Sequence, residues 1–388
     1  MSEVKFSSEE LARYSRHLIL PEFNIEGQKK LKQAKVLVVG TGGLGAPLLL
    51  YLTAAGVGTI GLVDFDVVDD SNLQRQVLFT REDLGQPKVQ AAKRRLEALN
   101  PYVKFVTYET ALTSDNALDI IKDFDVVADG TDNFPTRYLV NDACVLLGKV
   151  NVYASIYRFE GQATVFNYKD KHGVLGPNYR DLFPTPPPPG LVPSCAEGGV
   201  IGVLPGILGS LQASEVIKVI SGVGETLSGR LFLFDASSFE TRTLKIKRRK
   251  DNPLNGENPS QKGLIDYQQF CGVGAVESES KQEVKSINVK QLDELIKKHA
   301  RIQIVDVREA YEYEIANIKG ELMPKSEILQ HVPKISNDKQ VIVHCRSGKR
   351  SSDVIELLQE KYGFQNLYNL EGGILAWAKE IDHTMPTY

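Results

Sequence analysis

The segment GTGGLG at residues 40–45 constrains the fold of this chain more than any other part of the sequence. It follows a continuous apolar run at residues 36–39 and leads into an apolar stretch of helical length at residues 44–55. A second apolar run, at residues 59–63, ends at Asp64. Continuous apolar runs of this length are typical of buried parallel strands, so the order of elements predicts a β-α-β unit. Glycines in such a turn let backbone N–H groups approach a phosphate at the N-terminus of the helix.

Strands and helices alternate through the rest of the chain. This pattern predicts an α/β protein in which a Rossmann-like, doubly wound sheet is followed by a smaller α/β domain. In the first domain, further strands are expected at residues 125–128, 231–234 and 241–247, and further helices at residues 88–99, 136–147 and 205–220. In the second, strands are expected at residues 302–305 and 341–343, and helices at residues 289–298 and 351–362. Prolines interrupt the pattern between residues 172 and 193, where we expect a loop that covers or completes a site.

The length of 388 residues agrees with two domains, because a domain usually has roughly 100–200 residues. A polar stretch that is rich in turn-forming residues separates the two alternating regions and indicates a linker. We therefore expect domains at residues 1–250 and 284–388, joined by a linker at residues 251–283.

The composition argues against nucleic acid and membrane surfaces as partners. The chain has 46 basic and 49 acidic residues and a net charge of −3, whereas such binding is driven by excess positive charge. Its first residues are polar and acidic, unlike a signal peptide, and no segment is long and apolar enough to span a bilayer. Cys144, Cys195, Cys271 and Cys345 lie far apart without a CxxC pair, which argues against a disulfide framework. These features predict a cytoplasmic protein.

Asp64 and two basic residues indicate which nucleotide the glycine turn binds. Asp64 follows Gly43 by 21 residues and ends the second strand, where a carboxylate can accept hydrogen bonds from ribose hydroxyls. The turn and Asp64 alone fit NAD as readily as ATP, and they also fit a turn that binds no ligand. Arg75 and Lys88 favour ATP, because cations near the turn neutralise a triphosphate and stabilise departing pyrophosphate. Outside that setting, both would be ordinary surface charges.

Six segments together closely resemble the MoeB/ThiF group of ubiquitin-activating-type enzymes. They are GTGGLG, the strand end at Asp64, SNLQRQ at residues 71–76, GQPK at residues 85–88, DGTDN at residues 129–133, and YASIYRFEGQATVF at residues 153–166. The resemblance covers about residues 8–250. It implies a homodimer that uses ATP and Mg²⁺ to adenylate the C-terminal Gly-Gly of a ubiquitin-fold sulfur carrier. A carboxylate that attacks ATP brings two anions together, so magnesium and fixed cations must offset the repulsion.

The resemblance also implies roles for individual residues. Asp132 is the expected magnesium ligand, and Arg75 and Lys88 are expected to hold the phosphates. Arg16 is expected to reach across the dimer interface and complete the neighbouring subunit's site, although on its own it would be read as a charge on a helix surface. These four are the expected catalytic residues of adenylation. The full set of expected nucleotide-binding residues is Gly40, Gly42, Gly43, Gly45, Asp64, Ser71, Asn72, Leu73, Gln74, Arg75, Lys88, Asp132 and Asn133.

Two segments depart from the pattern of this family. Its members usually carry two CxxC pairs that bind structural zinc, and at the matching places this chain has NYRD at residues 178–181 and NGEN at residues 255–258. Asparagine and a single aspartate are poor zinc ligands, so we expect no structural zinc. The loop that zinc would tie down is then either held by packing or mobile.

Cys345 lies in the segment HCRSGKRS, directly after an expected strand and before an expected helix. Successive backbone N–H groups, the helix dipole and two nearby cations lower the pKa of a thiol in such a loop, which indicates a reactive cysteine rather than an inert buried one. From DVRE at residues 306–309 to LEGGILAW at residues 370–377, the region resembles a rhodanese. The resemblance implies a persulfide on Cys345, in a six-residue loop completed by Arg346, Ser347, Gly348, Lys349 and Arg350.

The whole arrangement resembles fusions of a MoeB-type domain with a rhodanese. It implies that a Cys345 persulfide, supplied by a sulfur donor such as a cysteine desulfurase, attacks the carrier adenylate to form a thiocarboxylate. Cys195 matches the family's mobile-loop cysteine, which is catalytic in some members and dispensable in others, and both alternatives stay open. Two rival hypotheses are a NAD-dependent oxidoreductase and a protein whose rhodanese domain only recruits a partner.

Overall fold

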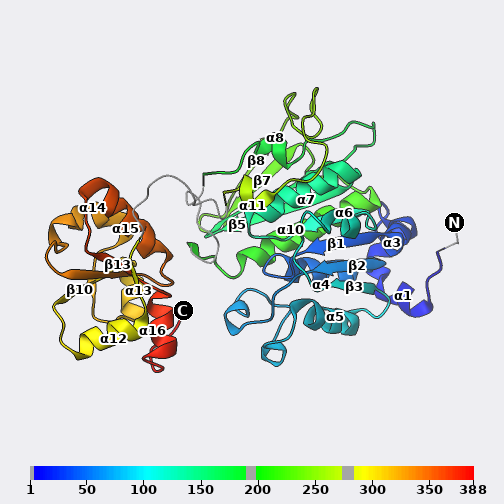
Figure 1. The fold of residues 1–388 in the computed structure, drawn as a ribbon. Coiled ribbons are helices and arrows are strands. Elements are labelled where there is room, and N and C mark those ends of the chain that lie inside the picture. The colour runs from blue at the N-terminus through cyan, green and yellow to red at the C-terminus, as the bar shows by residue number, and fades with distance from the viewer. Residues whose placement is uncertain (1–3, 189–197, 273–283) are drawn as a thin grey trace. The chain divides into compact units, whose positions relative to one another are not determined.

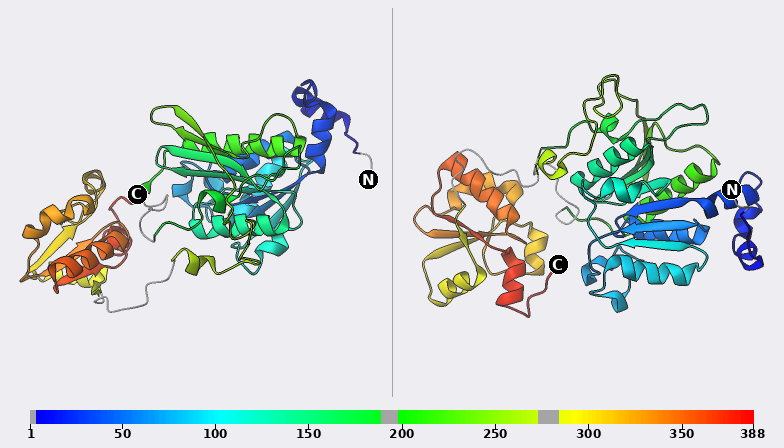
Figure 2. Two further views of the ribbon diagram at one scale, coloured as in Figure 1. Left: turned by 90° about the horizontal axis from the view of Figure 1, so that it is seen from above. Right: turned by 45° about the vertical axis from the view of Figure 1, so that its right-hand side comes forward.

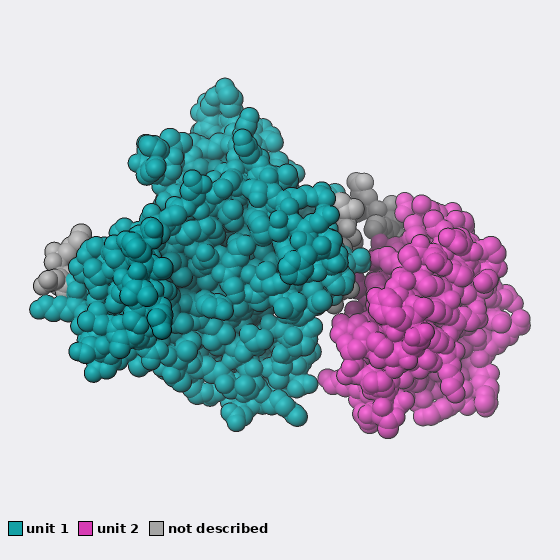
Figure 3. Space-filling view, turned by 180° about the vertical axis from the view of Figure 1, so that it is seen from behind, with its two compact units in different colours: residues 1–276 teal, residues 277–388 magenta. Residues whose placement is uncertain are grey.

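The computed structural model describes residues 4–188, 198–272 and 284–388. Its internal contacts divide the chain into two compact units, residues 1–276 and 277–388 (Figure 3). Each unit has its own β-sheet with helices packed on it. None of the helices in the described parts of the chain is both long and apolar enough to cross a membrane.

The first unit is built on an eight-stranded sheet with the order β3-β2-β1-β4-β5-β6-β7-β8 (Figure 1). The first five strands in this order are parallel, and β6, β7 and β8 add antiparallel pairs at one side. The strands are β1 (Lys35–Val39), β2 (Thr59–Val63), β3 (Lys104–Tyr108), β4 (Val126–Asp129), β5 (Val150–Tyr157), β6 (Glu160–Phe166), β7 (Arg230–Asp235) and β8 (Glu240–Lys245).

Helices cover both faces of this sheet (Figure 2). Val36 and Val38 of β1 belong to a core with α3, α4, α5 and α10, whereas Leu37 and Val39 belong to a core with α6, α7, α8 and α11. This alternation along one strand confirms the predicted doubly wound fold. The helices are α1 (Ser8–Arg13), α2 (Ser15–Leu18), α3 (Asn24–Gln33), α4 (Gly45–Ala55), α5 (Lys88–Leu99), α6 (Ala117–Ile121), α7 (Phe134–Leu147), α8 (Tyr179–Leu182), α10 (Leu204–Ser221) and α11 (Tyr267–Phe270), with short 3₁₀ turns at η1 (Asp70–Asn72) and η2 (Arg81–Asp83).

Residues 251–272, expected at the start of the linker, pack as part of the first unit. Helix α11 lies against α7, and Tyr267 is buried. The hydroxyl of Ser114 also donates a hydrogen bond to the carbonyl oxygen of Ile265 at 2.7 Å. The polar residues of this stretch therefore bond to the first unit and do not form an unattached linker.

The second unit holds a five-stranded parallel sheet with the order β11-β10-β12-β13-β9. Val341 and Val343 of β12 pack in a core with α14 and α15, and Ile342 packs in a core with α12 and α16. This confirms the predicted smaller α/β domain. Its elements are β9 (Ser286–Ile287), α12 (Val289–Lys297), β10 (Ile302–Asp306), α13 (Ala310–Ile315), β11 (Glu321–Leu322), η3 (Lys325–Glu327), α14 (Ile328–His331), η4 (Val332–Lys334), β12 (Gln340–His344), α15 (Lys349–Tyr362), β13 (Leu367–Leu370) and α16 (Gly373–Glu380).

Candidate active sites

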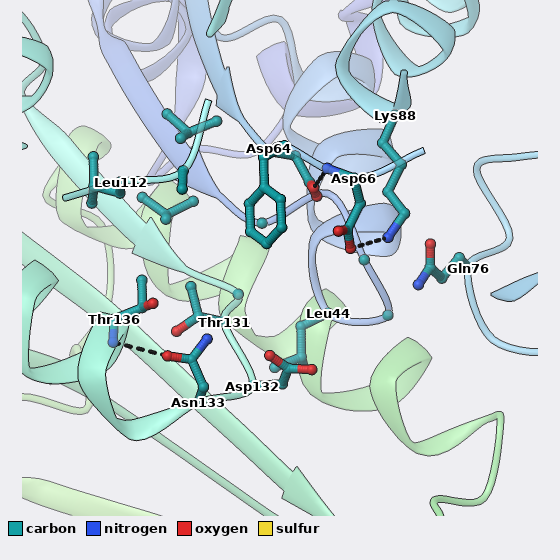
Figure 4. Close-up of a pocket in the computed structure, with 18 of the residues that line it drawn as sticks. Leu44, Asp64, Asp66, Gln76, Lys88, Leu112, Thr131, Asp132, Asn133 and Thr136 are labelled. Carbon is teal, nitrogen blue, oxygen red and sulfur yellow. Dashed lines mark hydrogen bonds and ion pairs between the residues drawn. The ribbon is translucent and has the colours of Figure 1, made fainter. Parts of the chain in front are cut away.

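A pocket lies in the first unit at the carboxyl ends of β1, β2 and β4 (Figure 4). The connections out of the sheet change direction between β1 and β4, and ligands bind at such switch points in open α/β sheets. Nine of the expected nucleotide-binding residues line this pocket: Gly40, Gly42, Gly43, Asp64, Asn72, Arg75, Lys88, Asp132 and Asn133.

The glycine turn is held in one conformation by Asp64. Gly40 has a φ of +88°, which favours glycine, and a Cβ atom on Gly45 would lie 2.0 Å from the Gly40 carbonyl oxygen. Both the backbone N–H and the hydroxyl of Thr41 donate hydrogen bonds to Asp64 Oδ2 at 2.8 Å. The turn and the end of β2 therefore form one rigid wall of the pocket.

Two cations are presented to the pocket by different segments. Lys88, at the start of α5, is only 5% exposed, and its Nζ lies 2.9 Å from the carboxylate of Asp66. Arg75 follows η1, and its Nη1 donates to the carbonyl oxygen of Ser71 at 3.1 Å. Both side chains line the same pocket as the glycine turn, as the sequence predicts for a phosphate site.

The loop after β4 supplies the other side of the pocket in the view of Figure 4. Asp132 is exposed there. The side-chain oxygen of Asn133 accepts a hydrogen bond from the Thr136 N–H at 2.9 Å and so caps α7. Because the N-terminus of a helix carries partial positive charge, α7 adds to the attraction of an anion in this pocket.

Some expected residues lie outside the pocket lining. Arg16 is exposed on α2 and does not line the pocket of its own chain, so its role in a neighbouring subunit stays a prediction. The other expected residues that do not line the pocket are Gly45, Ser71, Leu73 and Gln74. Gly45 acts through its close contact with the glycine turn.

The structure adds pocket residues that the motifs did not single out. Asp66 pairs with Lys88, and Gln76 presents a buried side-chain oxygen that has no hydrogen-bond partner among the described residues. Behind Thr131, Asp129 is fully buried, and burial raises the pKa of its carboxyl group. Its Oδ1 accepts hydrogen bonds from the N–H and hydroxyl of Thr131 at 2.9 and 2.6 Å. Gln76 and Asp129 fall within the motifs SNLQRQ and DGTDN, so the motifs contained the signal for both.

The two segments expected in place of zinc ligands meet in the fold. Asn178 Nδ2 donates to Asn255 Oδ1 at 3.0 Å, and Asn252 Nδ2 donates to Asp181 Oδ1 at 2.7 Å. We call these four residues the polar clamp. They offer amides and a single carboxylate that bond to one another, which does not fit a zinc site. No group of three metal-ligating His, Cys, Asp or Glu side chains occurs in the parts of the chain that the structure describes.

A buried ion pair lies beside the polar clamp. Arg180 of α8 donates to both carboxylate oxygens of Asp142 in α7, at 2.9 and 2.7 Å, and both side chains are at most 3% exposed. The hydroxyl of Tyr267 in α11 donates to Asp142 at 2.8 Å. The guanidinium of Arg180 also lies over the rings of Tyr138 and Phe270, 5.1 and 4.7 Å from their centres. Asp142 thus joins three helices, α7, α8 and α11.

The second candidate site surrounds Cys345, in the loop between β12 and α15. Cys345 is 1% exposed, and its Sγ accepts a hydrogen bond from the Gly348 N–H at 3.1 Å. The Ser351 hydroxyl lies 3.5 Å from the same sulfur. Gly348 has a φ of +96°, so glycine is favoured where the loop turns its N–H toward the sulfur. The loop therefore provides one backbone donor, at the residue before α15, and a nearby hydroxyl for an anion on the sulfur.

Two cations of the Cys345 loop have partners elsewhere in the second unit. Both terminal nitrogens of Arg350 lie 2.7 Å from the carboxylate of Glu312 in α13. Although burial opposes it, the hydrogen bonds from Arg350 hold the pKa of Glu312 below its usual value. Nε of Arg346 donates to the main-chain oxygen of Tyr388 at 2.6 Å. The sequence predicted the cations but not these partners.

The remaining cysteines are not comparable with Cys345. Cys195 lies outside the described residues, so its role stays a prediction. Burial raises the pKa of Cys144 far above its usual value and that of Cys271 to about 11. Both thiols are therefore protonated at neutral pH and poor nucleophiles.

Comparisons with known proteins cover both regions of the chain. Residues 14–255 match the ThiF family, and residues 288–380 match the rhodanese-like domain. The chain is 48% identical over 385 residues to the probable adenylyltransferase/sulfurtransferase MoeZ of Mycobacterium tuberculosis, covering 98% of this chain and 96% of that protein. It is 43% identical to the adenylyltransferase and sulfurtransferase MOCS3 of Bos taurus, covering 98% and 88%.

Two further similarities concern the first unit. The sulfur carrier protein adenylyltransferase of Thermus thermophilus is 54% identical over 270 residues, which cover 70% of this chain and all of that protein. The crystal structure of E. coli MccB superimposes with a TM-score of 0.56 at 22% identity, over 66% of this chain and 75% of that chain. At this identity the second similarity shows the fold alone.

Proposed function

Because this chain belongs to the ThiF family and carries a rhodanese-like domain, we propose that it adenylates a ubiquitin-fold sulfur carrier and then transfers sulfur to it. It is an enzyme, an adenylyltransferase and sulfurtransferase like its full-length relatives. The observation that carries the first half is the pocket that brings Arg75, Lys88 and Asp132 to the glycine turn. We assign adenylation to the first unit and sulfur transfer to the second.

In the adenylation step, an oxygen of the carrier's C-terminal carboxylate attacks the α-phosphorus of ATP. The bond between this phosphorus and the bridging oxygen breaks, and pyrophosphate leaves with the electron pair. Arg75 and Lys88 offset the negative charge of the phosphates as it shifts toward pyrophosphate, and the N–H groups of the glycine turn fix the phosphate position. Lys88 has to exchange some of its contact with Asp66 for the nucleotide.

The pocket also suits magnesium as a companion of ATP. Asp132 is an exposed carboxylate at the pocket wall, and hard oxygen ligands together with phosphates are what Mg²⁺ prefers. Bound there, the ion supplies charge neutralisation that the two cationic side chains alone do not provide. Asp132 is the residue proposed to hold it.

In the sulfur-transfer step, the Cys345 thiolate first attacks the outer sulfur of a donor persulfide and releases the donor thiolate. The resulting persulfide sulfur attacks the carbonyl carbon of the carrier adenylate, and AMP leaves with the electron pair. A thiolate then attacks Cys345 Sγ, and the S–S bond breaks so that the carrier leaves as its thiocarboxylate. Cys195 is the candidate for this thiolate, and a thiol reductant then reduces the disulfide formed. The hydrogen bond from Gly348 stabilises the anion on Cys345.

The remaining partners follow from the same proposal. We propose a homodimer in which Arg16 completes the site of the neighbouring subunit. A cysteine desulfurase is the proposed donor, because its product is a protein persulfide. A thiol-dependent reaction of this kind places the enzyme in the cytoplasm, where thiols stay reduced.

The proposal is tested by incubating the chain with ATP, Mg²⁺, a persulfide donor and a purified sulfur carrier that ends in Gly-Gly. Mass spectrometry of the carrier is expected to show one oxygen replaced by sulfur. Formation of the adenylate without this replacement would limit the enzyme to adenylation, with the rhodanese-like domain as a docking module. No adenylate with any tested carrier would refute the first half of the proposal.

We further propose that the first unit is held without structural zinc, by the polar clamp and by the Asp142–Arg180 ion pair. Replacing Asp142 with alanine is expected to lower the free energy of unfolding by about 3–5 kcal/mol, because Arg180 is left buried and unpaired. Urea unfolding of the first unit measures this loss. A chelator is expected to leave the midpoint of the unmodified chain unchanged.

Asp251→Ala is the matched control, since Asp251 pairs with Arg249 at an exposed position, where ion pairs contribute little. It is expected to leave the midpoint close to that of the unmodified chain. Equal losses in both variants would contradict the role of the buried pair. Stoichiometric zinc in the purified protein, or a lower midpoint with chelator, would contradict the absence of zinc.

A further inference from the structure

Tyr388 is folded back onto the Cys345 loop. Its main-chain oxygen accepts the hydrogen bond from Nε of Arg346, and its ring centre lies 5.6 Å from the guanidinium carbon of Arg346. Its hydroxyl contacts two more residues, Arg308 at 2.5 Å and Glu312 at 3.2 Å. Tyr388 thus binds Arg346, the first cation of the loop. It also binds Glu312, the carboxylate that pairs with Arg350, the last cation of the loop.

Glu312 accepts hydrogen bonds from both terminal nitrogens of Arg350, the last cation of this loop. The hydrogen bonds to Glu312 raise the pKa of Arg350, burial opposes this, and the charges of Glu312 and then of Cys345 raise the pKa further, so Arg350 is close enough to Cys345 for their charges to interact. The positive charge that reaches the sulfur therefore depends on how firmly Glu312 holds Arg350. The Tyr388 hydroxyl in turn donates to Glu312 Oε1 at 3.2 Å, the oxygen that also accepts from Arg350 Nη2.

The other charged groups near the loop are matched or neutral. Asp306 and Arg308 form a buried pair, with Arg308 Nε 2.9 Å from Asp306 Oδ1. His344 is buried, and burial lowers its pKa to about 4, so it is uncharged at neutral pH. Glu371, which precedes α16, is exposed, and Lys349 begins α15. Among the charged groups of the loop, Arg346 and Arg350 are thus the two whose partners the described residues define.

We propose that Glu312 and Tyr388 are positioning residues of sulfur transfer, which set the charge of the Cys345 loop by holding Arg350 and Arg346. The inference rests on the proposed sulfur transfer at Cys345. Neither residue touches the sulfur atom in the recorded contacts. When Arg350 is paired with Glu312, it attracts the anionic sulfur of Cys345 less strongly. The thiolate or persulfide then stays nucleophilic, because an anion held too strongly by a cation attacks more slowly.

The test measures how the alkylation rate of Cys345 by iodoacetamide depends on pH in the full chain. Mass spectrometry of the peptide that contains Cys345 separates it from the other cysteines. In Glu312→Gln, the charge of Arg350 is no longer compensated and favours the thiolate, so the midpoint is expected at a pH lower by about 0.5–1 unit. Tyr388→Phe, which keeps the ring and the main-chain oxygen but loses the hydroxyl that binds Glu312, is expected to move the midpoint less and in the same direction.

A purely structural role would change the rate by the same factor at every pH and leave the midpoint in place. That result, or a midpoint that moves to higher pH, would overturn the inference. Glu360→Gln is the control, because Glu360 is exposed on α15, ten residues and about 15 Å along the helix from Arg350. It makes the same change of charge and is expected to leave the midpoint unchanged. If Glu312→Gln does not fold, as judged by circular dichroism, Tyr388→Phe decides alone.

Sulfur transfer from thiosulfate to cyanide is measured in parallel, so that failure of the proposed function can be told apart from failure of the positioning role. A shifted alkylation midpoint in a chain that transfers no sulfur would refute the proposed function and keep the positioning of the loop. Normal transfer with an unshifted midpoint in both variants would refute the positioning alone.

Discussion

Asp132→Ala is expected to reduce ATP–pyrophosphate exchange by at least about a hundredfold. The physical reason is that the attacking carboxylate and the triphosphate repel one another, and the proposed magnesium ligand is lost. Because Asp132 is exposed, its removal is expected to change the stability of the fold little. The exchange of labelled pyrophosphate into ATP, with carrier present, measures the effect, and urea unfolding confirms that the fold is retained.

Asp119→Ala is a suitable control for this variant. Asp119 is an exposed aspartate of the same unit that pairs with Lys122 on α6, and it does not line the pocket. Its replacement is expected to leave exchange unchanged. Normal exchange in Asp132→Ala would remove Asp132 from the adenylation site, and a loss of equal size in both variants would mean that the assay reports something other than the pocket.

Cys345→Ser is expected to lower sulfur transfer from thiosulfate by about a thousandfold or more, while ATP–pyrophosphate exchange stays normal. A serine hydroxyl can still accept the hydrogen bond from Gly348, so the loop keeps its shape, but oxygen cannot carry the transferred sulfur as a persulfide. The two activities are measured on the same preparation. Loss of sulfur transfer with normal ATP–pyrophosphate exchange is the result expected if each unit carries out one of the two reactions.

Cys271→Ser is the matched control, because Cys271 is a buried thiol of the first unit. It is expected to retain both activities. Sulfur transfer that survives in Cys345→Ser would contradict the role of Cys345. It would favour the rival hypothesis that the rhodanese-like domain only recruits a partner. Loss of exchange in the same variant would mean that Cys345 also affects adenylation.

The glycine turn and its surroundings could be predicted from the sequence because the signals there are local. The run at residues 36–39, the turn and the helix appear where expected, and the helix expected at residues 88–99 coincides with α5. Strand β3 was not predicted, since KFVTY mixes polar and apolar residues at the side of the sheet. Its place depends on pairing with β2, which a local pattern does not contain.

The partners of the predicted site residues were harder to foresee. Lys88 was expected to be free for phosphate, but it pairs with Asp66, which lies 22 residues earlier in the chain. Arg350 was expected to act on Cys345, but it is shared with Glu312, 38 residues away. Such pairs are set by tertiary packing, so a motif can identify one member and remain silent on the other.

The region after residue 250 shows the same effect at the level of a domain boundary. Its polar residues are typical of a linker, yet Asn252 is buried in the polar clamp and Tyr267 reaches Asp142 across 125 positions of sequence. Composition alone does not separate polar residues that face solvent from polar residues that satisfy one another in the interior.

The polar clamp also bears on how the protein responds to oxidants. Zinc held by four thiolates is lost when those thiolates are oxidised, whereas amide and carboxylate groups are inert to the same agents. Of the described cysteines, Cys144 and Cys271 are kept protonated by burial, whereas the sulfur of Cys345, the proposed nucleophile, accepts a hydrogen bond from Gly348 that stabilises an anion. Oxidative stress is therefore expected to stop sulfur transfer while the adenylation unit stays folded, so the carrier would accumulate in its activated but sulfur-free form.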